Sequence, residues 1–336
     1  MAQLDLHYLG SFQKGTRLTT ENPTEEVWSR LSLHGSLDYL HDALKVTKLP
    51  KDKAAKYVAM RMRQATEFRG AYRGATLLTA PLTLYYAFLN LTRACLAIQA
   101  ETISTAAHGL RFTRKPKILE CQAQLKLGTF TDYLTANSVN WNSDTAISLD
   151  DCISRIIETG TEYFEVGGKP PLAVPIAVKA MRTGKTLFHF NEEWSGGKDH
   201  FRERWQSEYP SLIGHCSLEA EGCTLRIHEA EEPNSLDEVS NLCNRLLEVN
   251  LIWSDIPMWF TIRRTNSGLV WPRPAYYLAA LFILSSLVRY EPDLLFEEIS
   301  QNSKWVWFFK RFLEKAERFF PHLMFNWIHN GVHFFG

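Results

Sequence analysis

The segment PLTLYYAFLNLTRACLAIQAE, residues 81–101, decides the fold of this chain. Apolar residues recur at helical spacing on two sides of it, which predicts a helix that is apolar almost all the way round. Such a helix lies inside a bundle, with neighbours on every side. Arg93 is the one charged residue before Glu101. Its guanidinium loses water in that position and needs a partner, because burying an unpaired charge is very costly.

The composition is that of a folded protein with balanced charge. The chain has 336 residues, of which 45% are hydrophobic and 22% are charged, so it is long enough for two or three domains. Lys+Arg and Asp+Glu both number 37, which argues against a general electrostatic nucleic-acid binder but allows a local basic patch. Six scattered cysteines without a CxxC pair favour free thiols in a reducing compartment.

The sequence predicts a cytoplasmic protein that does not cross a membrane. The first residues, MAQLDLHYLGSF, lack the basic region and apolar core of a signal peptide. The longest apolar run, AYYLAALFILSSLV at 275–288, is shorter than the roughly 20 residues that a membrane-spanning helix needs. It is typical of a buried core helix.

Periodicity and capping residues place further elements around the central segment. Helices are expected over residues 24–44, 51–79, 235–252, 274–290 and 303–320. Strands are expected over residues 172–178, 186–190, 223–228, 258–264 and 269–271. Thr24 and Ser235 are the expected N-caps of two of the helices, and Gly222 the expected turn of a hairpin. The helix over 303–320 is amphipathic and carries an aromatic stripe.

Three blocks of the sequence resemble the bacterial YaaC-like protein family. The first is QATEFRGAYRGATLLTAPLTLYYAFLNLTRACLAIQAE (64–101), followed by a loop and HGL (108–110). The others are YYLAALFILSSLVRYEPDLL (276–295) and AERFFPHLMFNWI (316–328). The first block is also similar to the HEPN superfamily of four-helix bundles, which occur in prokaryotic toxins and antiviral systems.

This resemblance implies a mainly α (α+β) fold in four parts. Residues 1–50 form an N-terminal extension, and residues 51–160 form a HEPN-like helical bundle. Residues 161–272 form a mixed α/β segment with short antiparallel strands. Residues 273–336 form a helical region that packs on the bundle.

Many HEPN proteins are metal-independent ribonucleases whose arginine and histidine stand four to six residues apart, while others are binding or dimerisation modules. Arg93 and His108 are fifteen positions apart, so they meet only if the intervening loop folds back over the helix. As a catalytic pair they supply a base and a phosphate-binding cation. Alternatively, Arg93 pairs with a buried carboxylate and His108 caps the loop, which makes both residues structural.

Other residues offer weaker candidates. Four arginines form either a solvated helix face or an RNA-binding edge with interleaved aromatics: Arg61, Arg63, Arg69 and Arg73. Arg182 and His189 have nuclease-like spacing but fall in a predicted turn and strand. The group His215, Cys216, Cys223 and His228 lacks the close pairs of a zinc site, so no metal is expected. Arg289 is expected to serve the carbonyls of a helix C-terminus.

The leading hypothesis is a YaaC-like protein in nucleic-acid-linked conflict or stress, including antiviral defence, with metal-independent RNA cleavage as its chemistry. The alternative is a non-catalytic module that senses or scaffolds a partner, and the sequence leaves open whether the protein is an enzyme. A third hypothesis is a small-molecule or nucleotide binder. No cofactor is expected. The expected partners are RNA and either a second copy of the chain or a protein from the same operon.

Overall fold

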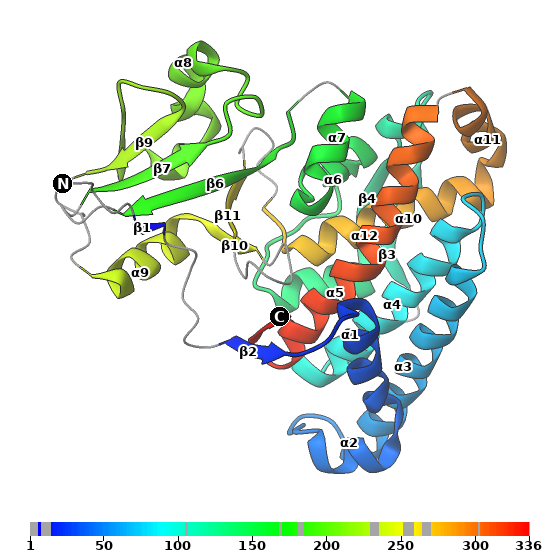
Figure 1. Ribbon diagram of the computed structural model, residues 1–336. Helices are drawn as coiled ribbons and strands as arrows, with labels where there is room; N and C mark the ends of the chain where they lie inside the picture. The colour runs from blue at the N-terminus through cyan, green and yellow to red at the C-terminus, as the bar shows by residue number, and fades with distance from the viewer. Residues whose placement is uncertain are drawn as a thin grey trace. The chain divides into compact units, whose positions relative to one another are not determined.

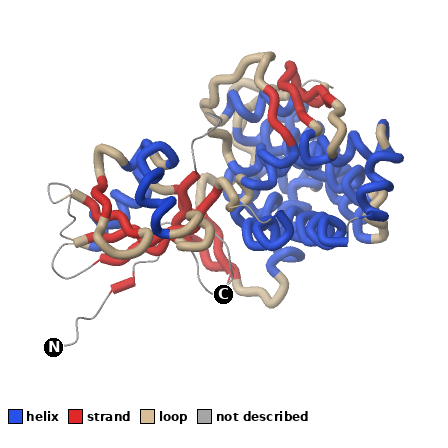
Figure 2. The backbone as a smooth tube through the Cα atoms, turned by 90° about the horizontal axis from the view of Figure 1, so that it is seen from above, coloured by secondary structure: helices blue, strands red, loops and turns tan. Residues whose placement is uncertain are grey.

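The computed structural model describes residues 6–7, 15–104, 107–167, 170–180, 185–228, 235–250, 259–263, 270–301 and 303–335. The chain divides into two compact units. The helical unit comprises residues 20–159 and 271–331, and the mixed unit comprises residues 1–19, 160–270 and 332–336. Helices dominate the first unit, and most of the strands lie in the second (Figure 2), which confirms the mainly α (α+β) class.

The core of the helical unit is built around α4, Ala80–Gln99. It packs against α3 (Lys51–Arg73), α10 (Arg273–Tyr290) and α12 (Ser303–Ile328), as Figure 1 shows. Every side chain of α4 from position 87 to position 97 is buried. The prediction of a helix without a solvent face is therefore confirmed.

An aromatic stripe docks α12 on this core, as its sequence predicts. The rings of Phe320 and Phe88 stack with centroids 4.0 Å apart. The predicted end of the helix at residue 320 is wrong, because α12 continues through Pro321 to Ile328. Proline has no N–H, so it leaves the carbonyl of Glu317 without its intrahelical donor. The indole Nε1 of Trp28 donates to that carbonyl at 3.3 Å, so this carbonyl keeps a hydrogen-bond donor.

The region before α3 is broken into shorter helices. The helix predicted over 24–44 is α1 (Pro23–Ser32), a 3₁₀ turn η1 (Leu33–Gly35) and α2 (Leu37–Ala43). Asn22, not Thr24, caps α1, and its side chain accepts from the Glu25 amide at 3.2 Å. Pro23 then occupies the first turn, where its missing N–H costs nothing. Residues 20–50, expected as an extension, thus belong to the helical unit.

A small antiparallel sheet follows α4, in a region predicted to be bundle helix. Its strand order is β3-β4-β5, formed by His108–Thr113, Gln122–Gly128 and Ala146–Ser148. Around it lie η2 (Ile118–Glu120), α5 (Thr129–Ala136), α6 (Leu149–Ser154) and η3 (Ile157–Thr159). The stretch from 51 to 160 is therefore not purely helical, and His108 begins a strand.

The mixed unit holds an antiparallel sheet with the order β10-β11-β6-β7-β9-β8, and β1 also pairs with β6. Its strands are β1 (Leu6–His7), β6 (Ala173–Ala180), β7 (Thr186–Phe190), β8 (Cys216–Leu218), β9 (Thr224–Ile227), β10 (Glu248–Asn250) and β11 (Trp259–Arg263). Alternate residues of β6, namely Val174, Ile176 and Val178, face the core. The strands predicted over 172–178, 186–190 and 223–228 are confirmed as β6, β7 and β9, and the one predicted over 258–264 as β11 in its described residues. The strand predicted over 269–271 is not found, because residues 270 and 271 are in no strand and residue 269 lies outside the described part.

The helices α8 (Lys198–Glu208), η4 (Pro210–Leu212) and α9 (Leu236–Leu246) contribute to the core of this sheet. The same unit also includes α7 (Gly160–Gly167). The Ser235 cap is confirmed, since its hydroxyl accepts from the Glu238 amide at 3.2 Å. The predicted extension of that helix to residue 252 is wrong, because residues 248–250 pair with β11. A separate parallel pair joins β2 (Gly15–Leu18) to β12 (Val332–Phe335).

In the part of the chain that the structure describes, no helix combines the length and the apolar character that crossing a bilayer requires.

Candidate functional site

Arg93 lies in the core of the helical unit, on the face of α4 toward α5. Its side chain is buried, and its Nε donates to Thr129 Oγ1 at 3.0 Å. The Thr129 hydroxyl in turn donates to the carbonyl of Ala107 at 3.1 Å. Ser104 Oγ lies 2.9 Å from the same hydroxyl and donates to Asp132 Oδ2 at 2.6 Å. Ser104 and Thr129 thereby connect the Asp132 carboxylate to Arg93 through their hydroxyl groups.

His108 is held against α4 by a close crossing of two backbone segments. Gly109 has a φ of +83° and Gly128 a φ of +146°, and a Cβ on Gly128 would lie 2.5 Å from the Gly109 nitrogen. Only glycine fits at such an approach. His108 Nδ1 lies 2.9 Å from the hydroxyl of Tyr85. Tyr85 stands eight positions before Arg93 on α4. The loop therefore folds back over the helix, as the catalytic interpretation of Arg93 and His108 requires.

Two more arginines approach the same region from other helices. Arg289, near the end of α10, has its Nη1 3.4 Å from the Tyr86 hydroxyl. Arg61 of α3 donates from Nη1 to Asn90 Oδ1 at 3.1 Å. We call the set Arg61, Asn90, Arg93, His108 and Arg289, with Tyr57, Tyr85 and Tyr86, the arginine–histidine cluster. Arg61, Tyr86, His108 and Arg289 are partly exposed, so the cluster reaches the surface.

The charges of the cluster act on one another. Burial, and then the positive charges of Arg93 and Arg289, lower the pKa of His108 to about 4. Burial and the nearby charge of Arg61 lower the pKa of the Arg93 guanidinium. Burial raises the pKa of the Tyr85 phenol, which stays protonated. His108 is thus neutral and lies among guanidinium groups that all carry a positive charge.

Several other arginines of the helical unit have carboxylate partners. Arg69 pairs with Glu25 and Glu317, at 2.6 and 2.8 Å. Arg155 pairs with Asp151 at 3.1 Å. By contrast, among the described residues neither Arg61 nor Arg289 forms an ion pair. Arg61 and Arg289 therefore bring positive charge to the cluster without a carboxylate in an ion pair, and such an arrangement favours the binding of an anion.

Arg61 and its neighbour Tyr57 also carry buried polar atoms without a hydrogen-bond partner. These atoms are Arg61 Nε and the Tyr57 hydroxyl, and the Arg61 guanidinium lies 5.2 Å from the Tyr57 ring centroid. Buried donors in folded proteins nearly always have an acceptor, and each exception calls for an explanation. A bound anion or an ordered water molecule supplies such an acceptor.

The four arginines of α3 that were predicted to act together have different surroundings. Arg61 belongs to the cluster, whereas Arg63 donates from Nε to the Gly35 carbonyl at 2.7 Å. Arg69 and Arg73 share Glu25 and Glu317, and the two guanidinium groups lower the pKa of Glu25. This geometry favours a structural role for Arg63, Arg69 and Arg73.

The remaining candidates do not assemble into a site. Arg182 lies outside the described residues, and His189 Nδ1 lies 3.0 Å from Thr224 Oγ1 on the neighbouring strand. Cys216 lies opposite Ile227 in the hairpin of β8 and β9. No group of three or more His, Cys, Asp or Glu side chains that could hold a metal occurs in the described part of the chain.

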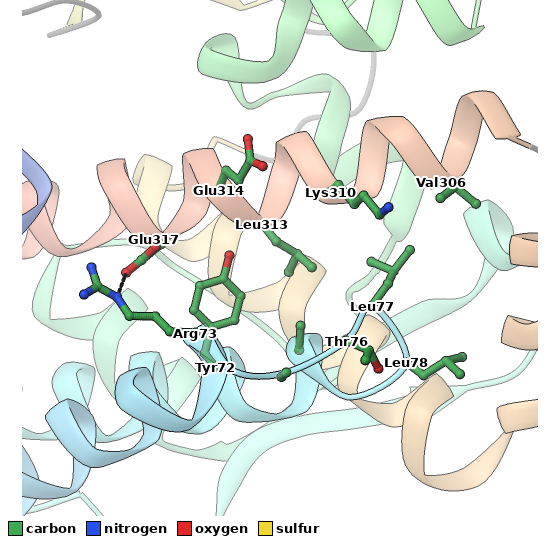
Figure 3. A pocket seen from close by; sticks show the side chains of 12 residues that line it. Tyr72, Arg73, Thr76, Leu77, Leu78, Val306, Lys310, Leu313, Glu314 and Glu317 are labelled. Atoms are coloured by element: carbon green, nitrogen blue, oxygen red, sulfur yellow. Dashed lines mark hydrogen bonds and ion pairs between the residues drawn. The ribbon is translucent and has the colours of Figure 1, made fainter.

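A groove of about 740 Å³ lies between the end of α3 and α12. Its lining includes Tyr72, Arg73, Leu77, Lys310, Leu313 and Glu317, and Figure 3 shows the Arg73–Glu317 ion pair at one end. Burial and the charges of Glu317 and Glu314 raise the pKa of Tyr72, so its phenol stays protonated. No residue of the arginine–histidine cluster lines this groove.

Five residues of the cluster were not singled out as functional from the sequence: Tyr57, Tyr85, Tyr86, Asn90 and Arg289. Asn90 had a detectable signal, because it stands four positions after Tyr86 and three before Arg93, on one helical face. Arg289 was predicted to serve helix carbonyls, and its Nε does donate to the Ser285 carbonyl at 3.1 Å. Nothing in the sequence near Arg289 predicts that it approaches Tyr86.

Comparison with known proteins supplies a family. No curated protein and no solved structure matches the chain. A family model described as YaaC-like Protein matches residues 30–328, a range that includes every residue of the arginine–histidine cluster. The chain belongs to the YaaC-like protein family.

Proposed function

We propose that the arginine–histidine cluster binds a phosphodiester of RNA and that the protein cleaves it without a metal ion. The observation that carries the proposal is the convergence of Arg93 and Arg289 on His108, with Arg61 close to Arg93 and no ion pair at Arg61 or Arg289 among the described residues. A phosphate group supplies the missing negative charge. It also supplies acceptors for guanidinium donors, which match phosphate oxygens geometrically.

The proposed reaction uses His108 as the base. With the Nδ1 proton donated to Tyr85 Oη, Nε2 keeps its lone pair and takes the proton of the ribose 2′-hydroxyl. The 2′-oxygen attacks phosphorus, and the bond from phosphorus to the 5′-oxygen breaks. The leaving oxygen takes a proton from water, and the products carry a 2′,3′-cyclic phosphate and a 5′-hydroxyl. The guanidinium groups stabilise the negative charge that develops on the phosphorane.

The biological setting that we propose is nucleic-acid-linked conflict or stress, including antiviral defence. It rests on the similarity of residues 64–110 to the HEPN superfamily. Assembly with a second copy or with a protein from the same operon stays a prediction. The second candidate function is a binding module that holds RNA or a protein partner without cleaving it. One observation favours it. The hydrogen-bond partner of His108 in the described part of the chain is the Tyr85 hydroxyl, and among the described contacts of His108 there is no group that would protonate the leaving oxygen.

Replacing Arg289 or Arg61 with glutamine is expected to weaken the binding of a single-stranded RNA oligonucleotide by about tenfold or more, because a charge-assisted hydrogen bond contributes about 1.5–3 kcal/mol. Fluorescence anisotropy at one fixed salt concentration measures the dissociation constant. Arg30→Gln is the matched control, because it removes the same charge from an exposed pair with Glu26. Equal affinities for all three variants and the wild type would count against the anion site.

The pKa of His108 is expected to rise when inorganic phosphate binds. Burial and two positive charges favour the neutral ring and hold the pKa at about 4 in the free protein. A bound anion offsets the field of Arg93 and Arg289 and thereby favours the protonated ring. NMR titration of the ring protons, assigned with His108→Gln, measures the shift. His329 is the control, because its pKa is lowered by burial and by Arg30 and should not respond to phosphate.

A further inference from the structure

We infer that Tyr290 is a stacking platform for a nucleobase, so that the ligand of the arginine–histidine cluster is single-stranded RNA. This inference rests on the proposed function, because the cluster supplies the phosphate contacts. It adds the part of the ligand that the ring would recognise, and it assigns a role to a residue outside the cluster.

Among the described residues, Tyr290 is the tyrosine beside the cluster whose ring is largely exposed. It ends α10 and is 63% exposed. Tyr85 is buried, and Tyr86 already stacks on Phe68 with centroids 5.3 Å apart. An aromatic ring that lies open to solvent beside a set of cations is the arrangement with which proteins bind single-stranded nucleic acid.

Arg289 couples the ring of Tyr290 to the cluster. Its guanidinium carbon lies 4.9 Å from the Tyr290 ring centroid, within the range of a cation–π contact. The same guanidinium reaches the Tyr86 hydroxyl and Ser286 Oγ, each at 3.4 Å. A phosphate held by Arg289 therefore places an adjacent base beside Tyr290.

The end of α10 is also tied to the strand that carries His108. Arg114 follows β3 directly, and its Nε pairs with Glu291 Oε2 at 2.8 Å. Glu291 is the residue after Tyr290. The ring and the histidine are thus positioned by the same two elements, α10 and β3, which are in contact.

Stacking of this kind selects an unpaired strand. A base inside a duplex has both faces covered by its neighbours, whereas a base of a single strand can turn out and lie against an aromatic ring. Stacking is tolerant of base identity, because every base has a π face. We therefore expect a preference for single strands without a strong preference for sequence.

The test compares two oligonucleotides of equal charge. One is a 2′-O-methyl hexanucleotide, which lacks the hydroxyl needed for cleavage, and the other is an abasic hexamer with the same backbone. Tyr290→Ala is expected to weaken binding of the first by about tenfold, the order of one lost base–aromatic stack, and to leave binding of the second unchanged. Tyr290→Phe should bind like the wild type. Phe296→Ala is the matched control, because Phe296 is 58% exposed on α11 (Pro292–Gln301).

The outcomes separate this inference from the proposed function. If the wild type binds neither oligomer, the phosphate site fails and the inference fails with it. If the wild type binds both and Tyr290→Ala changes neither affinity, the phosphate site stands and stacking is overturned. Stacking is also overturned if Tyr290→Ala weakens both oligomers equally, or if Tyr290→Phe loses as much affinity as Tyr290→Ala.

Discussion

The variant His108→Asn is expected to cleave RNA about 10²- to 10⁴-fold more slowly than the wild type, the usual contribution of a general base. Asparagine fills a similar volume and can hydrogen-bond to Tyr85, but it cannot take a proton at neutral pH. Because His108 does not supply the main phosphate contacts in the proposal, RNA affinity should change little. Single-turnover cleavage of labelled RNA in EDTA measures the rate, and the same assay shows whether a metal is needed.

The pH dependence gives this prediction a second readout. The base must be neutral, so the wild-type rate should rise with pH through the pKa of His108 in the RNA complex and then level off. That pKa lies above the value of about 4 in the free protein, because the bound phosphate offsets the arginine charges. Tyr85→Phe removes the hydrogen bond that positions the ring and should lower the rate less than His108→Asn does.

Two results would overturn the catalytic assignment. One is a wild-type protein that cleaves no RNA, either labelled tRNA or total RNA, in repeated assays. The other is an Arg93→Ala or His108→Ala variant that is folded and cleaves as fast as the wild type. Either result leaves Arg93 and His108 as structural residues and favours the binding module.

Replacing Glu158 with glutamine is expected to lower the free energy of unfolding by about 3–5 kcal/mol, the usual cost of breaking a buried ion pair. The Glu158 side chain is fully buried and accepts from Arg273, which is 11% exposed. It also accepts from the Tyr277 hydroxyl at 3.1 Å, and its main-chain carbonyl accepts from Lys315 at 2.6 Å. Without the carboxylate, the positive charge of Arg273 stays buried and uncompensated. Urea unfolding measures the change.

Two further variants make this prediction specific. Glu26→Gln breaks an exposed pair with Arg30 one helical turn away, and such pairs contribute about 0.3–0.5 kcal/mol. The double variant Glu158→Gln, Arg273→Met removes both charges and should recover part of the loss. A Glu158→Gln protein within about 1 kcal/mol of the wild type would show that the Arg273 charge is solvated or compensated elsewhere.

Local pattern explains which elements the sequence could predict. Apolar spacing in residues 81–101 has a helical period on two sides, and this determines a helix buried all round. The sequence-based predictions are wrong where the local pattern competes with a contact to a distant part of the chain. The helical pattern of 235–252 ends early because residues 248–250 pair with β11. The helix over 303–320 runs on because Trp28, far away in sequence, satisfies the carbonyl that Pro321 leaves free.

The same distinction between local pattern and distant contacts applies to the candidate site. By itself the sequence determined the helical core, the placement of one arginine inside it, and the recurring blocks of the YaaC-like family. It could not rank the arginines of α3, because the partners that distinguish Arg61 from Arg69 lie far away in sequence. Only the tertiary structure brings Glu317 to Arg69 across 248 positions and Arg289 to Tyr86 across 203. Helical period is a property of neighbouring residues, whereas the pairing of a charge depends on which distant helix packs beside it.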